Sequence, residues 1–126
     1  MRSKNLVVSN LNKTWIFDLD GTIVKHNGYK IDGHDTLLEG AKEFIQNIPG
    51  DDMIILITSR KNEYRDDTIK FLSENGIRYN HIIFEAPYGE RIVMNDAKPS
   101  GMMTAYAINT ERNKFYKGKI IIDNDI

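Results

Sequence analysis

The feature that most constrains this chain is a short apolar run, Trp15–Phe17, that leads directly into the sequence D-L-D-G-T at residues 18–22. Side chains at positions i and i+2 of an extended chain point the same way, so we expect the carboxylates of Asp18 and Asp20 to share one site. Gly21 permits a sharp turn after them, because it has no side chain to clash. The pattern predicts a buried strand whose carboxyl end holds two carboxylates.

Two neighbouring carboxylates suit phosphate chemistry. They repel each other, and a hard cation such as Mg²⁺ relieves the repulsion while attracting a phosphate. One carboxylate could then attack phosphorus while the other protonates the leaving oxygen. A short motif of this kind also fits an ordinary Asp-Gly turn after a strand, in which Asp18 caps a nearby segment.

Composition limits the size and class of the protein. The 126 residues, of which 40% are hydrophobic and 28% charged, fit a single domain over residues 1–126 with one core. The formal net charge is −1 and the basic residues are spread along the chain, which argues against a nucleic-acid partner. Cysteine is absent, so disulfides and thiolate metal sites are excluded. Leu6–Val8 is too short for a signal peptide or a membrane span, so we expect a cytoplasmic protein with no membrane partner.

Short apolar runs alternate with amphipathic segments, which predicts an α/β fold with a mainly parallel sheet. A polar segment over residues 23–35 reads as a loop over the D-L-D-G-T sequence. Apolar residues at helical spacing predict helices over 37–48 and from about 63 to 75. We expect strands at 15–17, 53–57, 82–84 and 91–94, and further strand-like runs at 104–109 and 119–122.

Ligands of open α/β sheets bind outside the carboxyl ends of the strands, and polar side chains follow several of the expected strands. Asp18 and Asp20 follow the first, Thr58 and Ser59 the second, and Asp96 the fourth. Each is ordinary by itself, since Thr58 could cap a helix and Asp96 could begin a turn. Their recurrence at successive strand ends favours one shared site.

These residues resemble the haloacid dehalogenase-like hydrolases, a superfamily dominated by Mg²⁺-dependent phosphatases. Residues 18–22 match its first motif in full, and Thr58 after the apolar run 54–57 matches its second. Asp96 after residues 91–95 looks like its acidic motif at a strand end. The resemblance covers residues 15 to about 101 and implies a Rossmann-like three-layer sandwich with a mainly parallel central sheet.

The resemblance also implies roles for single residues. Asp18 would be the nucleophile that forms an aspartyl-phosphate, and Asp20 would be the general acid and base. Thr58 would donate its hydroxyl to a phosphoryl oxygen. Asp18, Asp20 through its backbone carbonyl, and Asp96 would hold Mg²⁺. The remaining expected substrate- and phosphate-binding residues are Leu19, Gly21, Thr22, His26, Tyr29, Ser59 and Arg60.

Two departures from the family pattern concern charge. The family has a lysine or arginine beside the nucleophile, commonly just before the acidic strand, where this chain has Glu-Ala-Pro at 85–87. Lys98 and Arg91 are the candidates, and we prefer Lys98 because it would lie at the carboxyl end of the expected strand, although either could be a solvated surface charge. Asn95 replaces the first of two aspartates in the acidic motif, and loss of that charge could weaken Mg²⁺ binding.

The gaps between the motifs leave no room for a cap domain. The site is then open, which implies a large substrate or a lid from a neighbouring subunit. Residues 25–35 form the expected flap-like loop, with His26, Asn27, Tyr29 and His34 as adaptable polar groups. A solvated hairpin tip is the alternative for each of them.

The resulting hypothesis is a Mg²⁺-dependent phosphatase that hydrolyses a phosphomonoester, such as a sugar phosphate, through an aspartyl-phosphate. Three alternatives remain: a catalytically degenerate binding domain, suggested by Ala86 and Asn95, a phosphotransferase, and a phosphatase for nucleic acid 3'-phosphate ends. The spacing of Asp18 and Asp20 argues against a phospho-receiver domain. The apolar run 120–122 near the C-terminus is a candidate contact for a homo-oligomer.

Overall fold

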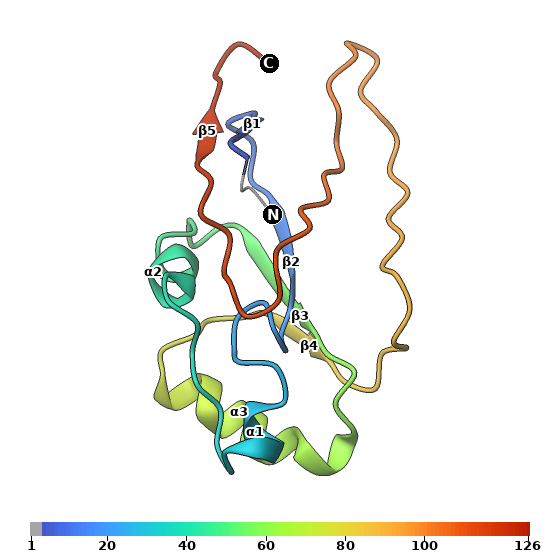
Figure 1. Ribbon diagram of the computed structural model, residues 1–126. Helices are drawn as coiled ribbons and strands as arrows, with labels where there is room; N and C mark the ends of the chain where they lie inside the picture. Colours follow the sequence, from blue (N-terminus) through green and yellow to red (C-terminus); the bar gives the residue numbers. More distant parts are fainter. Residues whose placement is uncertain (1–3) are drawn as a thin grey trace.

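The computed structural model describes residues 4–126 and contains two open parallel sheets together with short helices, an α/β arrangement (Figure 1). The larger sheet has the order β2-β3-β4, and the smaller one pairs β1 with β5. The strands are β1 (Leu6–Val8), β2 (Thr14–Asp18), β3 (Met53–Ile57), β4 (His81–Ile83) and β5 (Ile120–Ile122).

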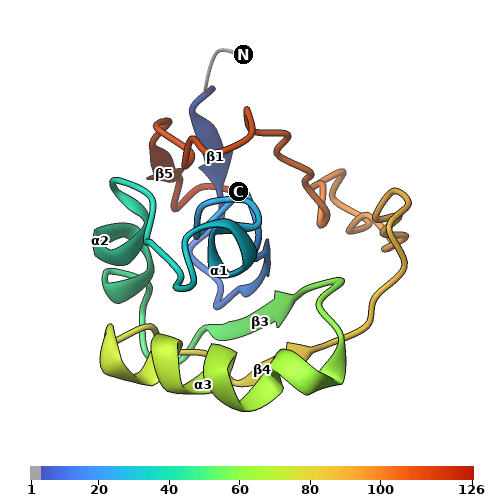
Figure 2. The same cartoon turned by 60° about the horizontal axis from the view of Figure 1, so that its bottom comes forward.

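Helices occupy both connections of the larger sheet, as parallel neighbours require. Figure 2 shows α3 running along β3 and β4, while α2 lies to one side of the sheet. No helix among residues 4–126 is long and apolar enough to cross a membrane. The helices are α1 (Gly28–Ile31), α2 (Ala41–Gln46), the 3₁₀ helix η1 (Asn62–Tyr64) and α3 (Arg65–Glu74).

The core lies against one face of the larger sheet. Ile54 and Leu56 of β3 are fully buried, in a cluster that includes Ile45 of α2 and Leu72 of α3. Aromatic rings extend this cluster: the ring centroid of Phe44 lies 5.6 Å from that of Trp15, 6.3 Å from that of Phe17 and 5.2 Å from that of Phe115. These contacts fasten the segment around Phe115 to β2 and α2.

The opposite face of the same sheet is open. Side chains alternate along a strand, and on this face Ile16 is 55% exposed, Met53 40% and Ile83 48%. We call the surface formed by these three residues with Ile55 and Ile57 the open face. An uninterrupted apolar strand such as β3 is typical of a sheet covered on both sides, so this exposure is unusual.

Most of the predicted elements are confirmed with small changes at their ends. β2, β3, β4, β5 and α3 with η1 form where the sequence predicts them. The helix predicted over 37–48 is wrong in length, because Leu37 forms a β-bridge with Val24 and Gly40 has a φ of 89°, so α2 begins only at Ala41. The loop 23–35 contains the short helix α1, and β1 was not predicted.

The strands predicted at 91–94 and 104–109 are wrong. Residues 88–108, which we call the arm, contain no strand and leave the sheet as a long two-limbed excursion (Figure 1). The limbs are joined near the tip, where Asn95 donates to the Thr104 hydroxyl at 3.0 Å and the Lys98 N–H donates to the Met102 carbonyl at 2.9 Å. An apolar run becomes a strand only when a second backbone pairs with it, and no described backbone pairs with 91–94.

Candidate functional site

Asp18 is the last residue of β2, and the turn after it places its carboxylate at the edge of the site. The ladder continues for one more bond, from the Leu19 N–H to the Ile57 carbonyl at 3.2 Å, and the chain then turns at Gly21 with a φ of 82°. This turn brings the Thr22 hydroxyl back to the Asp18 carboxylate at 3.2 Å. The side chain of Asp18 is 42% exposed, so the carboxylate remains accessible.

The pKa of Asp18 is raised above the ordinary aspartate value. Burial of part of the carboxyl group is the main cause, and the nearby charge of Asp20 adds to it. The hydrogen bond from Thr22 and the positive charge of Arg91 act in the opposite direction and offset part of the rise. The ionised carboxylate of Asp18 is therefore less stable than a solvated one, and a nearby cation would stabilise it.

Asp20 is held in a buried cluster with Arg60 and Asp35. The Arg60 guanidinium lies 2.8 Å from Asp20 Oδ1 and 2.7 Å from Asp35 Oδ1, and it also donates to the Thr68 hydroxyl at 2.9 Å. Arg60 is only 4% exposed, and the ring centroid of Tyr29 lies 3.9 Å from its guanidinium carbon. All five N–H donors of Arg60 have partners, so none is left for a phosphate.

The charge of Arg60 is strongly stabilised by this cluster. Burial would lower its pKa, but the hydrogen bonds and charges of Asp35 and Asp20 raise the pKa well above the ordinary arginine value. The guanidinium is a fixed positive charge behind Asp20. The expected phosphate-binding role of Arg60 is replaced here by an ion-pair role.

Thr58 and Ser59 follow β3, as the sequence predicts. Thr58 is fully buried, and its hydroxyl donates to Asp20 Oδ2 at 3.1 Å while accepting the Arg60 N–H at 3.1 Å. The Ser59 hydroxyl donates to the Pro87 carbonyl at 3.4 Å. Thr58 thus orients Asp20, and the structure does not direct its hydroxyl toward a free phosphate position.

The flap-like loop 25–35 is fastened over the turn at both of its ends. Asp35, with a side chain 6% exposed, holds one end to Arg60. At the other end the His26 N–H donates to the Asn113 side chain at 2.7 Å, and the Asn113 N–H donates to the Gly21 carbonyl at 2.8 Å. His26 of the flap therefore lies beside the turn at Gly21, and the ring of Tyr29 lies over the Arg60 guanidinium that pairs with Asp20.

Arg91, and not Lys98, is the basic residue beside Asp18. The Arg91 guanidinium lies 3.7 Å from Asp18 Oδ1 and donates to the carbonyls of Pro87 and Gly89 at 3.3 and 3.0 Å. Lys98 is exposed near the tip of the arm. The preference for Lys98 assumed a strand at 91–94, and because that strand does not form, its carboxyl end does not exist.

Because no strand forms at 91–94, Asp96 lies apart from Asp18 and Asp20. Asp96 is exposed near the arm tip, where its backbone carbonyl accepts the Thr104 hydroxyl, and Asn95 also bonds to Thr104. Within residues 4–126, no three Asp, Glu, His or Cys side chains are placed to hold a metal ion together. Of the predicted Mg²⁺ ligands, the structure brings Asp18 and Asp20 together and leaves Asp96 apart.

Sequence reasoning missed three residues that shape the site. Asp35, Thr68 and Asn113 are not among the predicted site residues. Asn113 has a φ of 66°, and asparagine is enriched in this left-handed region, so a polar segment around it carried a weak turn signal. Nothing in the sequence ties Asp35 or Thr68 to Arg60, because their contacts depend on the tertiary fold.

Comparison of the chain with models of protein families, with curated proteins and with solved structures found no match.

Proposed function

We propose that this chain is a phosphatase of the haloacid dehalogenase-like type that hydrolyses a phosphomonoester. The observation that carries the proposal is the setting of Asp18. Its carboxylate is accessible at the carboxyl end of β2, with the Thr22 hydroxyl on one oxygen and the Arg91 guanidinium 3.7 Å from the other. An accessible carboxylate beside a cation suits attack on an anionic phosphate.

In the proposed reaction an oxygen of Asp18 attacks phosphorus, and the bond from phosphorus to the ester oxygen breaks. The leaving oxygen takes up a proton from Asp20, the proposed general acid. Water then attacks the aspartyl-phosphate and gives a proton to Asp20, which releases inorganic phosphate and regenerates both Asp18 and Asp20. Arg60 and Thr58 hold Asp20 as an oriented carboxylate, a state that suits accepting the proton of that water. Arg91 offsets negative charge beside Asp18.

Mg²⁺ fits this proposal through few protein ligands. The ion commonly binds one or two carboxylates and completes its shell with water and substrate phosphate oxygens. The exposed carboxylate of Asp18 and the backbone carbonyl of Asp20 are the groups that would hold it, and Asp96 is left out because it lies on the arm. When bound, Mg²⁺ would neutralise charge on the phosphoryl group.

The finer description of the fold belongs to the same proposal. Haloacid dehalogenase-like cores are Rossmann-like sandwiches of three layers, and we propose this architecture for the chain, with the open face as the place of the third layer. We further propose a small phosphorylated metabolite in the cytoplasm as substrate, because the near-neutral charge gives no electrostatic attraction for a polyanion.

One observation favours a second candidate, a phosphate-binding domain without catalysis. Both oxygens of the Asp20 carboxylate accept hydrogen bonds from Arg60 or Thr58, so neither oxygen is directed toward a leaving group. In this candidate Asp18 and Arg91 would bind phosphate, and no bond to phosphorus would form.

Phosphate release from a panel of sugar phosphates, nucleotides and a 3'-phosphorylated oligonucleotide tests both candidates, with and without Mg²⁺. We expect turnover that Asp18→Asn abolishes and that the control Asp32→Asn, which only breaks the exposed pair with Lys25, leaves intact. An intact chain that binds phosphate but turns over none of these compounds would favour the binding domain. Turnover that survives Asp18→Asn would refute the assignment of the nucleophile.

A further inference from the structure

The arm and the larger sheet each present an unpartnered apolar surface. On the arm, Met94 is 90% exposed, Tyr88 83%, Ile92 79% and Val93 61%. Beyond Arg91, whose guanidinium lies 3.7 Å from Asp18 at the end of β2, the arm runs apart from β2, β3 and β4 in both views (Figures 1 and 2). Contiguous apolar surface of this kind on a small protein commonly marks an interaction site.

Most of the backbone of the arm is unpaired. Between residues 88 and 108, the described backbone–backbone hydrogen bonds are the two turn bonds at the tip, from Lys98 to Met102 and from Gly101 to Lys98. The carbonyls of Gly89, Asp96 and Thr104 accept side-chain bonds from within the arm. An extended backbone with free N–H and C=O groups is prepared to join the edge of a sheet.

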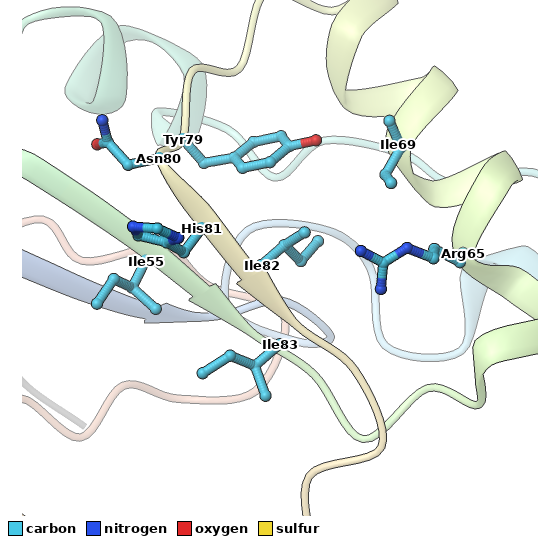
Figure 3. Close-up of a pocket in the computed structure, with 8 residues that line it drawn as sticks. All are labelled: Ile55, Arg65, Ile69, Tyr79, Asn80, His81, Ile82 and Ile83. Atoms are coloured by element: carbon cyan, nitrogen blue, oxygen red, sulfur yellow. The ribbon is translucent and has the colours of Figure 1, made fainter.

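β4 offers such an edge. It pairs with β3 on one side, and no described strand lies on the other. A groove of about 530 Å³ runs along this edge, with Ile69 of α3, Tyr79 and Ile82 on one side of the strand (Figure 3). Ile83 and Ile55, on the other side of the sheet, belong to the open face (Figure 3). Arg65, Asn80 and His81 also line the groove. A strand added here would meet Ile82 on one face and Ile83 on the other, with these polar side chains beside them.

We propose that the arm of one copy adds as a strand to the β4 edge of a second copy, and that the exchange is reciprocal in a two-fold dimer. Residues Ile92–Met94 match the three residues of β4 in length. Because side chains alternate, Ile92 and Met94 would lie on one face of the joined sheet and Val93 on the other. Either register would place apolar side chains both in the groove and beside the open face.

The available area is adequate for a stable dimer. The exposed apolar side chains of the arm, together with Ile83 beside the β4 edge, are 45–90% exposed. At roughly 60–120 Å² of apolar surface per fully exposed side chain, they offer about 500 Å² on each copy. Two copies would bury on the order of 1,000 Å² of apolar surface, which corresponds to roughly 1,700 Å² in total and lies within the standard size of specific interfaces.

Sedimentation velocity between about 1 and 100 μM tests the exchange on the full chain. We expect a dimer that the double variant Ile92→Lys/Met94→Lys converts to a monomer, because both side chains point into solvent in the single copy and the substitution spares the core. Ile83→Lys on the receiving side should do the same. The matched control Ile122→Lys, on the equally exposed β5, should remain a dimer. A monomer for the intact chain, or a dimer that survives the arm substitutions, would overturn the proposal.

Cross-linking separates exchange between copies from an arm that folds back onto its own sheet. The chain has no cysteine, so Val93→Cys and Ile83→Cys can be introduced as the only thiols. A mixture of the two single variants should give a cross-linked dimer with a short bis-maleimide. A double variant that cross-links within one chain while the mixed singles do not react would show that the arm covers its own β4, and would overturn the exchange.

Discussion

Replacement of Arg60 by methionine should be among the most destabilising single changes outside the apolar core. The substitution keeps much of the side-chain volume but removes five hydrogen-bonded N–H donors and the positive charge between Asp20 and Asp35. Those carboxylates, whose side chains are 17% and 6% exposed, would remain buried without a cation. Breaking a buried pair in this way costs about 3–5 kcal/mol. That cost is a large part of a total stability of about 5–15 kcal/mol.

Urea unfolding followed by circular dichroism, with the fluorescence of Trp15 as a second probe, measures this cost. Trp15 packs on Phe44 in the core and so reports on tertiary structure. Lys70→Met is the matched control, because it breaks an exposed pair with Glu74 at 3.9 Å and should cost less than about 0.5 kcal/mol.

The double variant Arg60→Met/Asp35→Leu sharpens the test. If the cost of Arg60→Met comes from an unpaired buried carboxylate, removing Asp35 as well should restore part of the loss, and the two changes should be non-additive by about 1–3 kcal/mol. An Arg60→Met cost below about 1 kcal/mol, or simple additivity with Asp35→Leu, would refute this account of the cluster.

Three further changes test Asp18, the buried carboxylate of Asp52 and the turn at Gly21. Asp18→Asn should abolish turnover yet stabilise the fold slightly at pH 7, by less than about 1 kcal/mol because the side chain is 42% exposed. Since the pKa of Asp18 is raised in the folded state, the gain in melting temperature should shrink as the pH falls toward and below the unfolded pKa of about 4. A gain that stays the same at that pH would contradict this prediction. Asp52→Ala should cost about 1–3 kcal/mol, because the buried carboxylate accepts bonds from Trp15, Asn12 and the Lys13 N–H. Burial would raise the pKa of Asp52, but these bonds lower it, so its stabilising effect should be lost only as the pH falls through that lowered value, as an acid titration of Trp15 fluorescence can show. Gly21→Ala should cost about 1–2 kcal/mol because of the φ of 82°, whereas Gly50→Ala, in open space, should be close to neutral in the same urea assay.

The parts of the fold that the sequence predicts are those with local causes. An apolar run of strand length identifies β3, and helical spacing with Gly76 at the end identifies α3, whatever the rest of the chain does. The prediction of strands in the arm is wrong because strand formation there depends on a distant partner. Residues 91–94 have strand composition, but pairing needs a second backbone, and composition cannot say whether that backbone lies in the same copy.

Part of the candidate site could also be predicted from the sequence, and part could not. Adjacent strand ends are expected to converge, and Asp18, Asp20 and Thr58 do lie together because β2 and β3 pair in register. The role of Arg60 follows from a different cause. An arginine beside two carboxylates can bind a phosphate or neutralise its neighbours, and only the number of filled donors decides between these roles.

Here Asp35 of the flap accepts hydrogen bonds from the Arg60 donors that Asp20 and Thr68 do not occupy. Arg60 therefore orients Asp20 and has no donor left for a phosphate. Arg91 then supplies the cation nearest to Asp18 Oδ1, from a segment whose other residues lead into the arm. If the arm docks on a second copy, the position of Arg91 depends on that contact. Substitutions at Ile92 and Met94 should therefore alter phosphate binding at Asp18 as well as the oligomeric state, although neither side chain touches the site.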